Sequence, residues 1–232
     1  MIYFRGKALE SVAPVMVEDI RVSPIPRTPL VRDRPIQGGA DFVRMHDGTR
    51  TITITFGLLV QDPEARQNSI DAITRWALSD QPAPMQLPYR NNRMIDVVCT
   101  NLPEPSARQW WESRLAITFV AYEPYFYAQE EKSAACGTAF YVAGDAPPAM
   151  WITRTVASAS TGDYYSDGTD IMFFSAIPAG NLVVDLNRQT IAVSGTSVMS
   201  SLMFNSSFII PRTGSITING TGTVHWRERW RS

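Results

Sequence analysis

The residues from Tyr122 to Tyr127 are the part of the sequence best suited to chemistry. The run Tyr-Glu-Pro-Tyr-Phe-Tyr places one carboxylate, Glu123, among four aromatic side chains. Glycoside hydrolases need two carboxylates across a cleft, and Asp185 and Glu228 are candidate partners. Their spacing does not support a pair, and an acid beside a proline is also typical of a solvated turn. A sugar-stacking platform, a catalytic carboxylate and a structural turn therefore stay open as interpretations.

Two tryptophans near the C-terminus, Trp226 and Trp230, could also stack on sugar rings. The segment TVHWRERW alternates as a strand does, so both tryptophans fall on one face. A sugar site needs that face exposed, whereas a core or an interface needs it covered. We favour the covered alternative, because aromatic side chains are prominent in cores and interface centres.

The sequence predicts no catalytic site, no metal site and no cofactor. It contains no GxSxG, P-loop or HExxH motif. Its two histidines, His46 and His225, give little choice of a general base. Cys99 and Cys136 lie in no zinc-binding spacing, and a single disulfide between them is left open.

The composition excludes several classes of protein. A hydrophobic fraction of 44% with 19% charged residues is typical of a soluble globular chain. No apolar run approaches the roughly 20 residues of a membrane-spanning helix, and the N-terminus lacks a signal-peptide pattern, so we expect no membrane insertion. The net charge of −1 argues against specific nucleic-acid binding, which needs a basic excess.

The elements that position these residues are mostly strands. RTITITFGLLVQ (50–61) predicts a half-buried strand, and a helix follows, with Asp62 as its N-cap and Pro63 at its first position, ending near residue 80. RLAITFVA (114–121) predicts the strand that closes this half, before a small, polar linker. The last hundred residues hold short apolar runs typical of a β-sandwich, including a hairpin turning at Asn187-Arg188.

The segment from about residue 24 to 48 is rich in proline and arginine and predicts an extended, irregular excursion. A long structureless stretch of this kind is often a binding arm, and it would be poorly ordered alone.

The order of these parts resembles the distal tail proteins of siphophages, which also occur in prophages and gene transfer agents. The resemblance lies in FRGKAL, PIQGGADF, RTITITF, ITRWAL and FVAYEPYFY in the first half, and in GDAPPAMWIT, NLVVDLNRQTIAV, PRTGSITING and VHWRERW in the second. It implies a mainly β protein: an antiparallel, β-sandwich-like N-terminal domain with one α-helix that forms a ring (1–130), a linker with the first strand of the second domain (131–146), and a galectin-like β-sandwich (147–232).

The resemblance implies a structural virion protein with no enzymatic activity. Six copies would form a hub ring at the tail tip, bound to the tail tube protein, to a tail-associated hub or fibre protein and to a receptor-binding protein, with DNA passing through the lumen. The protein would be made in the cytoplasm of the bacterial host. The alternative function is a carbohydrate-binding module for host attachment.

The ring suggests roles for particular residues. In the arm, the arginines could pair with carboxylates of the neighbouring copy; they are Arg27, Arg32, Arg34 and Arg44. In the aromatic run, five residues are expected at the junction of the two domains; they are Glu123, Pro124, Tyr125, Phe126 and Tyr127.

Overall fold

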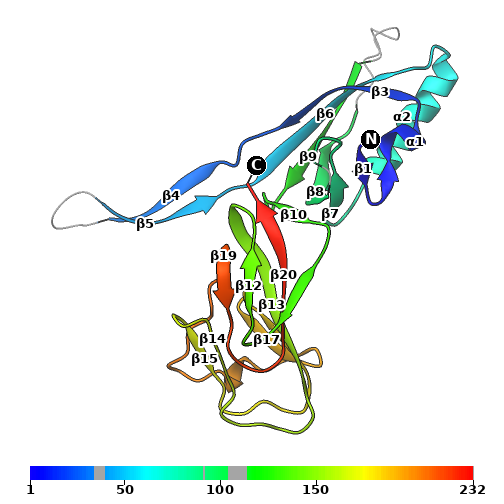
Figure 1. Cartoon of the computed structure of the whole chain (residues 1–232). Coiled ribbons are helices and arrows are strands. Elements are labelled where there is room, and N and C mark those ends of the chain that lie inside the picture. The colour runs from blue at the N-terminus through cyan, green and yellow to red at the C-terminus, as the bar shows by residue number, and fades with distance from the viewer. Residues whose placement is uncertain (34–39, 91, 104–113, 232) are drawn as a thin grey trace. The chain divides into compact units, whose positions relative to one another are not determined.

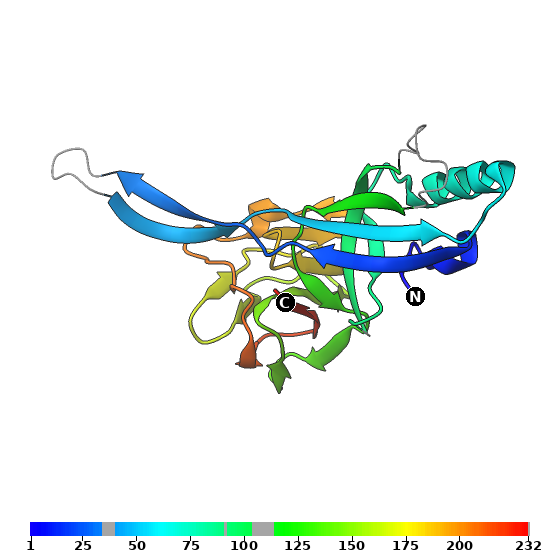
Figure 2. The same cartoon turned by 90° about the horizontal axis from the view of Figure 1, so that it is seen from above.

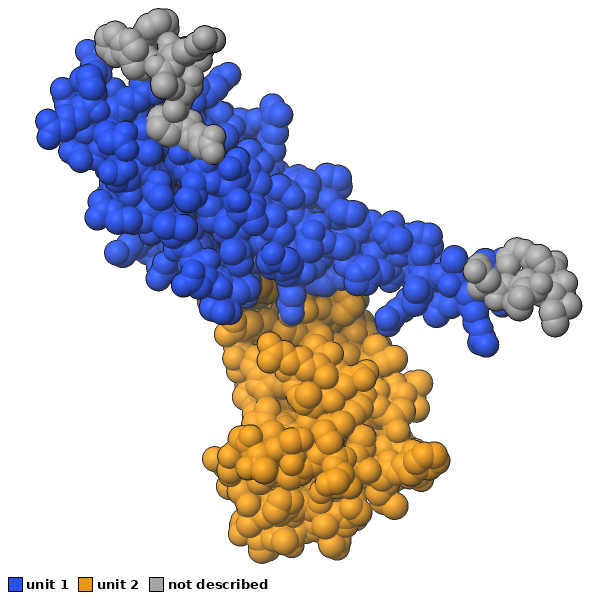
Figure 3. Space-filling model, turned by 180° about the vertical axis from the view of Figure 1, so that it is seen from behind, with its two compact units in different colours: residues 1–126, 232 blue, residues 127–231 orange. Residues whose placement is uncertain are grey.

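The computed structural model describes residues 1–33, 40–90, 92–103 and 114–231. The chain divides into two compact units, Met1–Phe126 and Tyr127–Arg231 (Figure 3). Both units are built mainly of antiparallel strands, as the sequence predicted. Within the described residues, no helix is long and apolar enough to cross a membrane.

The first unit is built on an antiparallel sheet in the order β2-β1-β7-β8-β9-β6-β3 (Figure 1). Strand β8 pairs with β7 through its first half and with β9 through its second half, so it joins the two parts of the sheet. The strands are β1 (Tyr3–Phe4), β2 (Lys7–Ala8), β3 (Val15–Val22), β6 (Arg50–Leu58), β7 (Ala83–Gln86), β8 (Arg93–Asn101) and β9 (Arg114–Ala121).

Strand β6 shows why the sheet forms where it does. Its apolar residues alternate with threonines, and Ile52, Ile54 and Phe56 have no exposed surface. Its two neighbours continue this buried face, since Ile54 lies opposite Ile117 of β9 and Ile20 of β3. The alternation therefore fixes which face of β6 joins the core, because a slip by one residue would turn every threonine inward.

Helix α2 (Pro63–Ala77) covers part of this core. Its N-terminus is fixed by the predicted cap, since the Asp62 Oδ2 atom accepts a hydrogen bond of 2.8 Å from the Ala65 backbone N–H. Trp76 packs edge-on against Phe4 and Phe119, with ring centroids 5.6 and 6.2 Å away. The helix ends three residues before the predicted position near 80, at Ala77.

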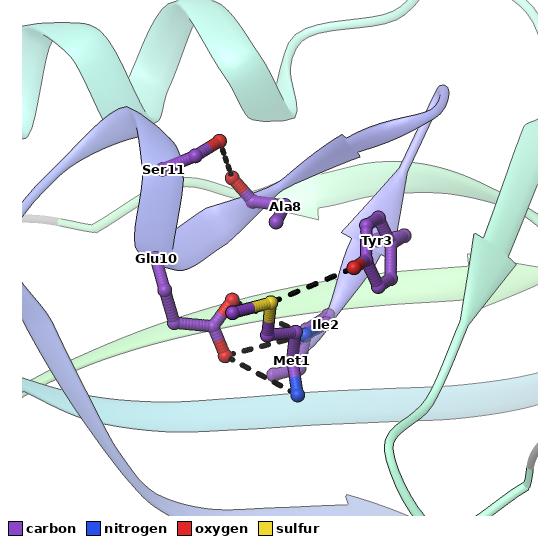
Figure 4. A network of polar contacts seen from close by, with 6 residues as sticks. All are labelled: Met1, Ile2, Tyr3, Ala8, Glu10 and Ser11. Atoms are coloured by element: carbon purple, nitrogen blue, oxygen red, sulfur yellow. Dashed lines mark hydrogen bonds and ion pairs between the residues drawn. The ribbon is translucent and has the colours of Figure 1, made fainter.

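A short helix, α1 (Leu9–Val12), follows the N-terminal hairpin and fixes the chain end. The Glu10 carboxylate accepts hydrogen bonds from the backbone N–H of Ile2, with both oxygens 3.3 Å away, and lies 3.8 Å from the Met1 amino group (Figure 4). The Ser11 hydroxyl donates to the Ala8 carbonyl oxygen at 2.7 Å. One acidic side chain thus satisfies the terminal charge and the backbone donor just before the first strand.

The second unit is a β-sandwich. One layer is a sheet in the order β18-β17-β16-β13-β20-β11. The pairs β12 with β19 and β14 with β15 form separate two-stranded sheets. The elements are β11 (Lys132–Ala135), β12 (Ala139–Val142), β13 (Ala146–Val156), β14 (Tyr164–Ser166), β15 (Ile171–Phe173), β16 (Gly180–Asp185), β17 (Thr190–Val193), β18 (Thr196–Ser197), the 3₁₀ helix η1 (Met199–Ser201), β19 (Gly214–Thr217) and β20 (Thr223–Trp230).

The core of the second unit joins these layers. Met150 and Ile152 of β13 are buried together with Tyr165 of β14 and Met172 of β15. The hairpin predicted at Asn187-Arg188 is present, since β16 pairs with β17 on either side of that turn. The segment 131–146 contains two strands, β11 and β12, and the strand β10 (Phe126–Ala128) begins at the last residue of the first unit.

Candidate interaction site

The segment predicted to be irregular is a two-stranded ribbon. Strand β4 (Arg27–Asp33) pairs antiparallel with β5 (Ala40–Asp47), and Figures 1 and 2 show this β4–β5 arm extending from the sheet of the first unit. The prediction of an irregular excursion was therefore wrong. Pro29 is accommodated because a two-stranded ribbon leaves one edge of each strand unpaired, where a missing N–H costs no ladder bond.

The base of the arm is held by Asp47. Its Oδ1 atom accepts a hydrogen bond of 3.0 Å from Arg27 Nε, and its Oδ2 atom accepts one of 2.7 Å from the Tyr125 hydroxyl. Only 8% of the Asp47 side chain is exposed. Arg27 and Asp47 pair within the arm, so of these two contacts the Tyr125 bond is the one that ties the arm to the rest of the first unit. A hydrogen bond to a charged group contributes about 1.5–3 kcal/mol.

One face of the arm is apolar and open. The register places Pro29 opposite Met45 and Val31 opposite Phe42, so these four side chains share a face. Phe42 is 64% exposed, and Val31 is 49% exposed. A two-stranded ribbon has no core of its own against which an apolar strip could pack. An exposed apolar strip of this kind is expected at a protein interface.

The opposite face of the arm carries charge. Arg32 lies opposite Asp41, and Arg44 lies opposite Leu30, with both arginines exposed. Of the four arginines expected at an interface, three are exposed, because Arg27 is also exposed while it forms its ion pair with Asp47. Arg34 lies outside the described residues.

The aromatic run after Glu123 forms no platform. Glu123 is exposed, and Pro124 is buried. Phe126 has no exposed surface, and the guanidinium carbons of Arg90 and Arg50 lie 4.2 and 5.3 Å from its ring centroid. These cation–π contacts place Phe126 in the core of the first unit, where it is unavailable for stacking on a sugar.

The remaining junction residues are partly buried. Tyr125 is occupied by its hydrogen bond to Asp47. Tyr127 is half-buried and is the first residue of the second unit. The boundary between the two compact units thus falls inside the five residues expected at a domain junction, while their packing role there stays a prediction.

The C-terminal tryptophans do not present a sugar-binding face. Trp226 is 4% exposed, and its ring stacks on Phe140 with centroids 4.4 Å apart. Trp226 is therefore unavailable for stacking on a sugar, because its side of β20 faces the core together with Val224. Trp230 is half-buried near the end of the same strand.

Two of the carboxylates considered for catalysis are engaged in local contacts. Asp185 Oδ1 accepts hydrogen bonds of 3.0 and 2.9 Å from the backbone N–H groups of Asn187 and Arg188. Glu228 is buried and accepts hydrogen bonds from Lys132 Nζ at 2.7 Å and from the Ala143 backbone N–H at 3.2 Å. Across the part of the chain that the structure describes, no group of three or more His, Cys, Asp or Glu side chains is arranged to hold a metal ion. Both thiols, Cys99 and Cys136, are free, and burial raises their pKa, which lowers their thiolate fraction.

The fold is that of a phage tail hub protein. A solved structure of the SPP1 Dit protein, described as a paradigm of the hub adsorption apparatus in phages that infect Gram-positive bacteria, is 14% identical and covers 98% of both chains with a TM-score of 0.72. A chain of the phage P2 baseplate, in its activated conformation with Ca, is 7% identical over 96% of this chain and 92% of that one, with a TM-score of 0.48.

The likeness to Dit confirms the fold that the sequence resemblance implied, including the galectin-like second unit. No family model matches the chain, and no curated protein matches it.

Proposed function

We propose that this chain is the structural hub protein of a phage tail tip. The observation that carries the proposal is the likeness of fold to a hub protein over both units, with 98% of each chain aligned. In this role six copies form a closed ring that joins the tail tube protein to the tail-tip apparatus. That apparatus comprises a tail-associated hub or fibre protein and a receptor-binding protein. DNA passes through the ring, and the protein resides in the virion after synthesis in the cytoplasm of its bacterial host.

The β4–β5 arm supplies one side of the ring interface. A cyclic ring needs a heterologous interface, in which one surface of each copy meets a different surface of the next. The apolar strip of Val31 and Phe42 is shaped for burial on such a neighbour, and the exposed Arg32 and Arg44 are available for carboxylates at the interface rim.

The chemistry of the chain supports a structural role. Glu228 is paired with Lys132, and burial raises the pKa of the Cys99 and Cys136 thiols, so these groups are poor candidates for catalysis. The net charge of −1 also suits a lumen in which DNA must slide without being held, because tight phosphate binding needs a basic excess.

Native mass spectrometry of the purified full-length chain tests the proposal. We expect a species of six times the 25.9 kDa mass of one chain, whose fraction rises with protein concentration. Addition of the tail tube protein from the same phage should raise the fraction of rings at a given concentration. A persistent monomer at every concentration, with and without that partner, contradicts the proposal.

A further inference from the structure

The second unit has a sheet face on the side opposite its core. On β13, Trp151, Thr153 and Thr155 alternate with the buried Met150 and Ile152, so they point to the opposite side of the sheet from the core. The register extends this face to both neighbouring strands. Thr153 lies between Val183 of β16 and Thr223 of β20, and Thr155 lies opposite Asn181.

A hollow of about 790 Å³ lies over one end of this face. Its lining is dominated by side chains that both donate and accept hydrogen bonds. They are Thr153, Thr155, Ser158, Asn181, Thr221 and Thr223. Hydroxyl and amide groups of this kind match a ligand that itself carries many hydroxyl groups.

An aromatic pair lies next to the hollow. The rings of Trp151 and His225 are parallel, with centroids 5.6 Å apart and planes that differ by 6°. The imidazole is fixed on both sides, since Nδ1 lies 2.9 Å from Glu131 Oε1 and Nε2 lies 2.9 Å from Thr153 Oγ1. Both rings are half-buried, so the pair is a preorganised flat ring surface that still reaches solvent.

The charged groups that line the hollow indicate the charge of its ligand. Arg154 is the one charged residue in its described lining, and Arg154 Nη1 is 2.7 Å from Asp163 Oδ1 in a largely buried ion pair. A phosphate or an acidic sugar would need cations that are not already neutralised. A neutral, hydroxyl-rich ligand needs none.

The contacts Thr153–His225–Glu131 follow the order of a hydrolytic triad, but the site lacks the rest of the machinery. Thr153 lies in the middle of β13, which is paired on both sides, with Val183 and with Thr223. The backbone N–H groups around it are therefore engaged in the sheet and cannot form an oxyanion hole. The arrangement fixes the imidazole for binding and does not provide for bond cleavage.

We propose that this face binds a neutral oligosaccharide, with the sugar ring packed on the Trp151–His225 pair and its hydroxyl groups bonded in the hollow. Sugars combine apolar C–H faces with hydroxyl groups, which this pairing of aromatic and hydroxyl side chains complements. The proposal goes beyond the hub role and does not depend on ring formation.

Glycan-array screening of the full-length chain, followed by calorimetry on the neutral glycans that bind, tests the proposal. Two variants remove different parts of the site. Trp151→Ala deletes the aromatic surface, and Asn181→Ala truncates an exposed amide that has no part in the core. Each should weaken binding about tenfold or more, the effect of losing one well-placed contact. Tyr141→Ala is the matched control, because Tyr141 is exposed on β12, outside this sheet.

Several results would overturn the proposal: no neutral glycan bound, binding of acidic glycans alone, or affinity unchanged in both Trp151→Ala and Asn181→Ala. The native mass of each variant is measured alongside. A chain that forms rings but binds no glycan refutes only this inference, whereas a chain that binds glycan but stays monomeric at every concentration, with and without the tail tube protein, refutes only the hub role.

Discussion

At the scale of single residues, the aromatic run after Glu123 shows that chemically suggestive residues can act as anchors. Tyr125 donates a hydrogen bond to Asp47 at the base of the arm, and Phe126 packs beside two guanidinium groups. Their position in the sequence indicated a special role but did not indicate their partners. Phe126 contacts Arg50 and Arg90, and Tyr125 bonds to Asp47, which lies 78 positions earlier in the chain. Only the folded chain brings these partners together.

Replacing Tyr125 by Phe should lower the free energy of unfolding by about 1–3 kcal/mol, because the buried Asp47 carboxylate loses a donor. Urea unfolding measures this loss, and hydrogen exchange should show faster exchange at the base of β4 and β5. Tyr122→Phe is the control, since Tyr122 is 63% exposed. Equal stability of the two variants would show that the contact does not hold the arm.

Asp163 gives the second unit a dependence on pH. Burial opposes ionisation of Asp163, but hydrogen bonds from Ser160 and Arg154 and the charge of Arg154 outweigh it and lower the pKa of the carboxyl group. Because the folded pKa is the lower one, the stabilisation is complete above the unfolded pKa of about 3.9 and is lost as the pH falls through the folded pKa.

The chain should therefore lose stability below about pH 4, and Asp163→Asn should be less stable at pH 7 and less sensitive to acid in that range. Urea midpoints measured between pH 7 and pH 3 check this expectation. The exposed Asp80 supplies the control, Asp80→Asn. A midpoint for Asp163→Asn that falls with acid as steeply as that of the unmodified chain would contradict the assignment.

At the scale of elements, the arm is the feature that most directly links structure to assembly. Val31 and Phe42 are exposed on its apolar face, so replacing both with Asp should leave the monomer folded. An unpaired carboxylate buried in the interface costs several kcal/mol, so ring formation should weaken about 100-fold or more. Native mass spectrometry and circular dichroism measure the two effects.

The matched control for this variant is Phe204→Asp, the same change at a fully exposed phenylalanine of the second unit. If the doubly substituted arm forms rings at the same concentration as the unmodified chain, the arm is not part of the interface.

The elements that could be predicted from the sequence are those that are specified by residues close to one another in the chain. The Thr/Ile alternation located β6, and Asp62 with Pro63 located the start of α2, because each pattern acts within a few residues. The arm could not be predicted as a ribbon, since its prolines break local patterns and its pairing joins two strands that are separated in the sequence. The sheet face of Trp151 and His225 needs a register between strands 74 positions apart, which no local pattern specifies.

At the scale of the whole molecule, both units share the fold of a hub protein, and each has its own core. Separate cores allow the two units to carry different surfaces, and the two proposals place assembly on the first unit and glycan binding on the second. The arm of the first unit and the polar sheet face of the second are surfaces that neither core requires. The hub proposal accounts for the arm, and the glycan proposal accounts for the sheet face.

Electron microscopy of the purified full-length chain tests the central claim most directly. The hub proposal predicts class averages of a closed ring with sixfold symmetry and an open centre, which disappear when Val31 and Phe42 are replaced by Asp. Monomers alone at high concentration, open filaments, or rings that persist in the doubly substituted arm would contradict it.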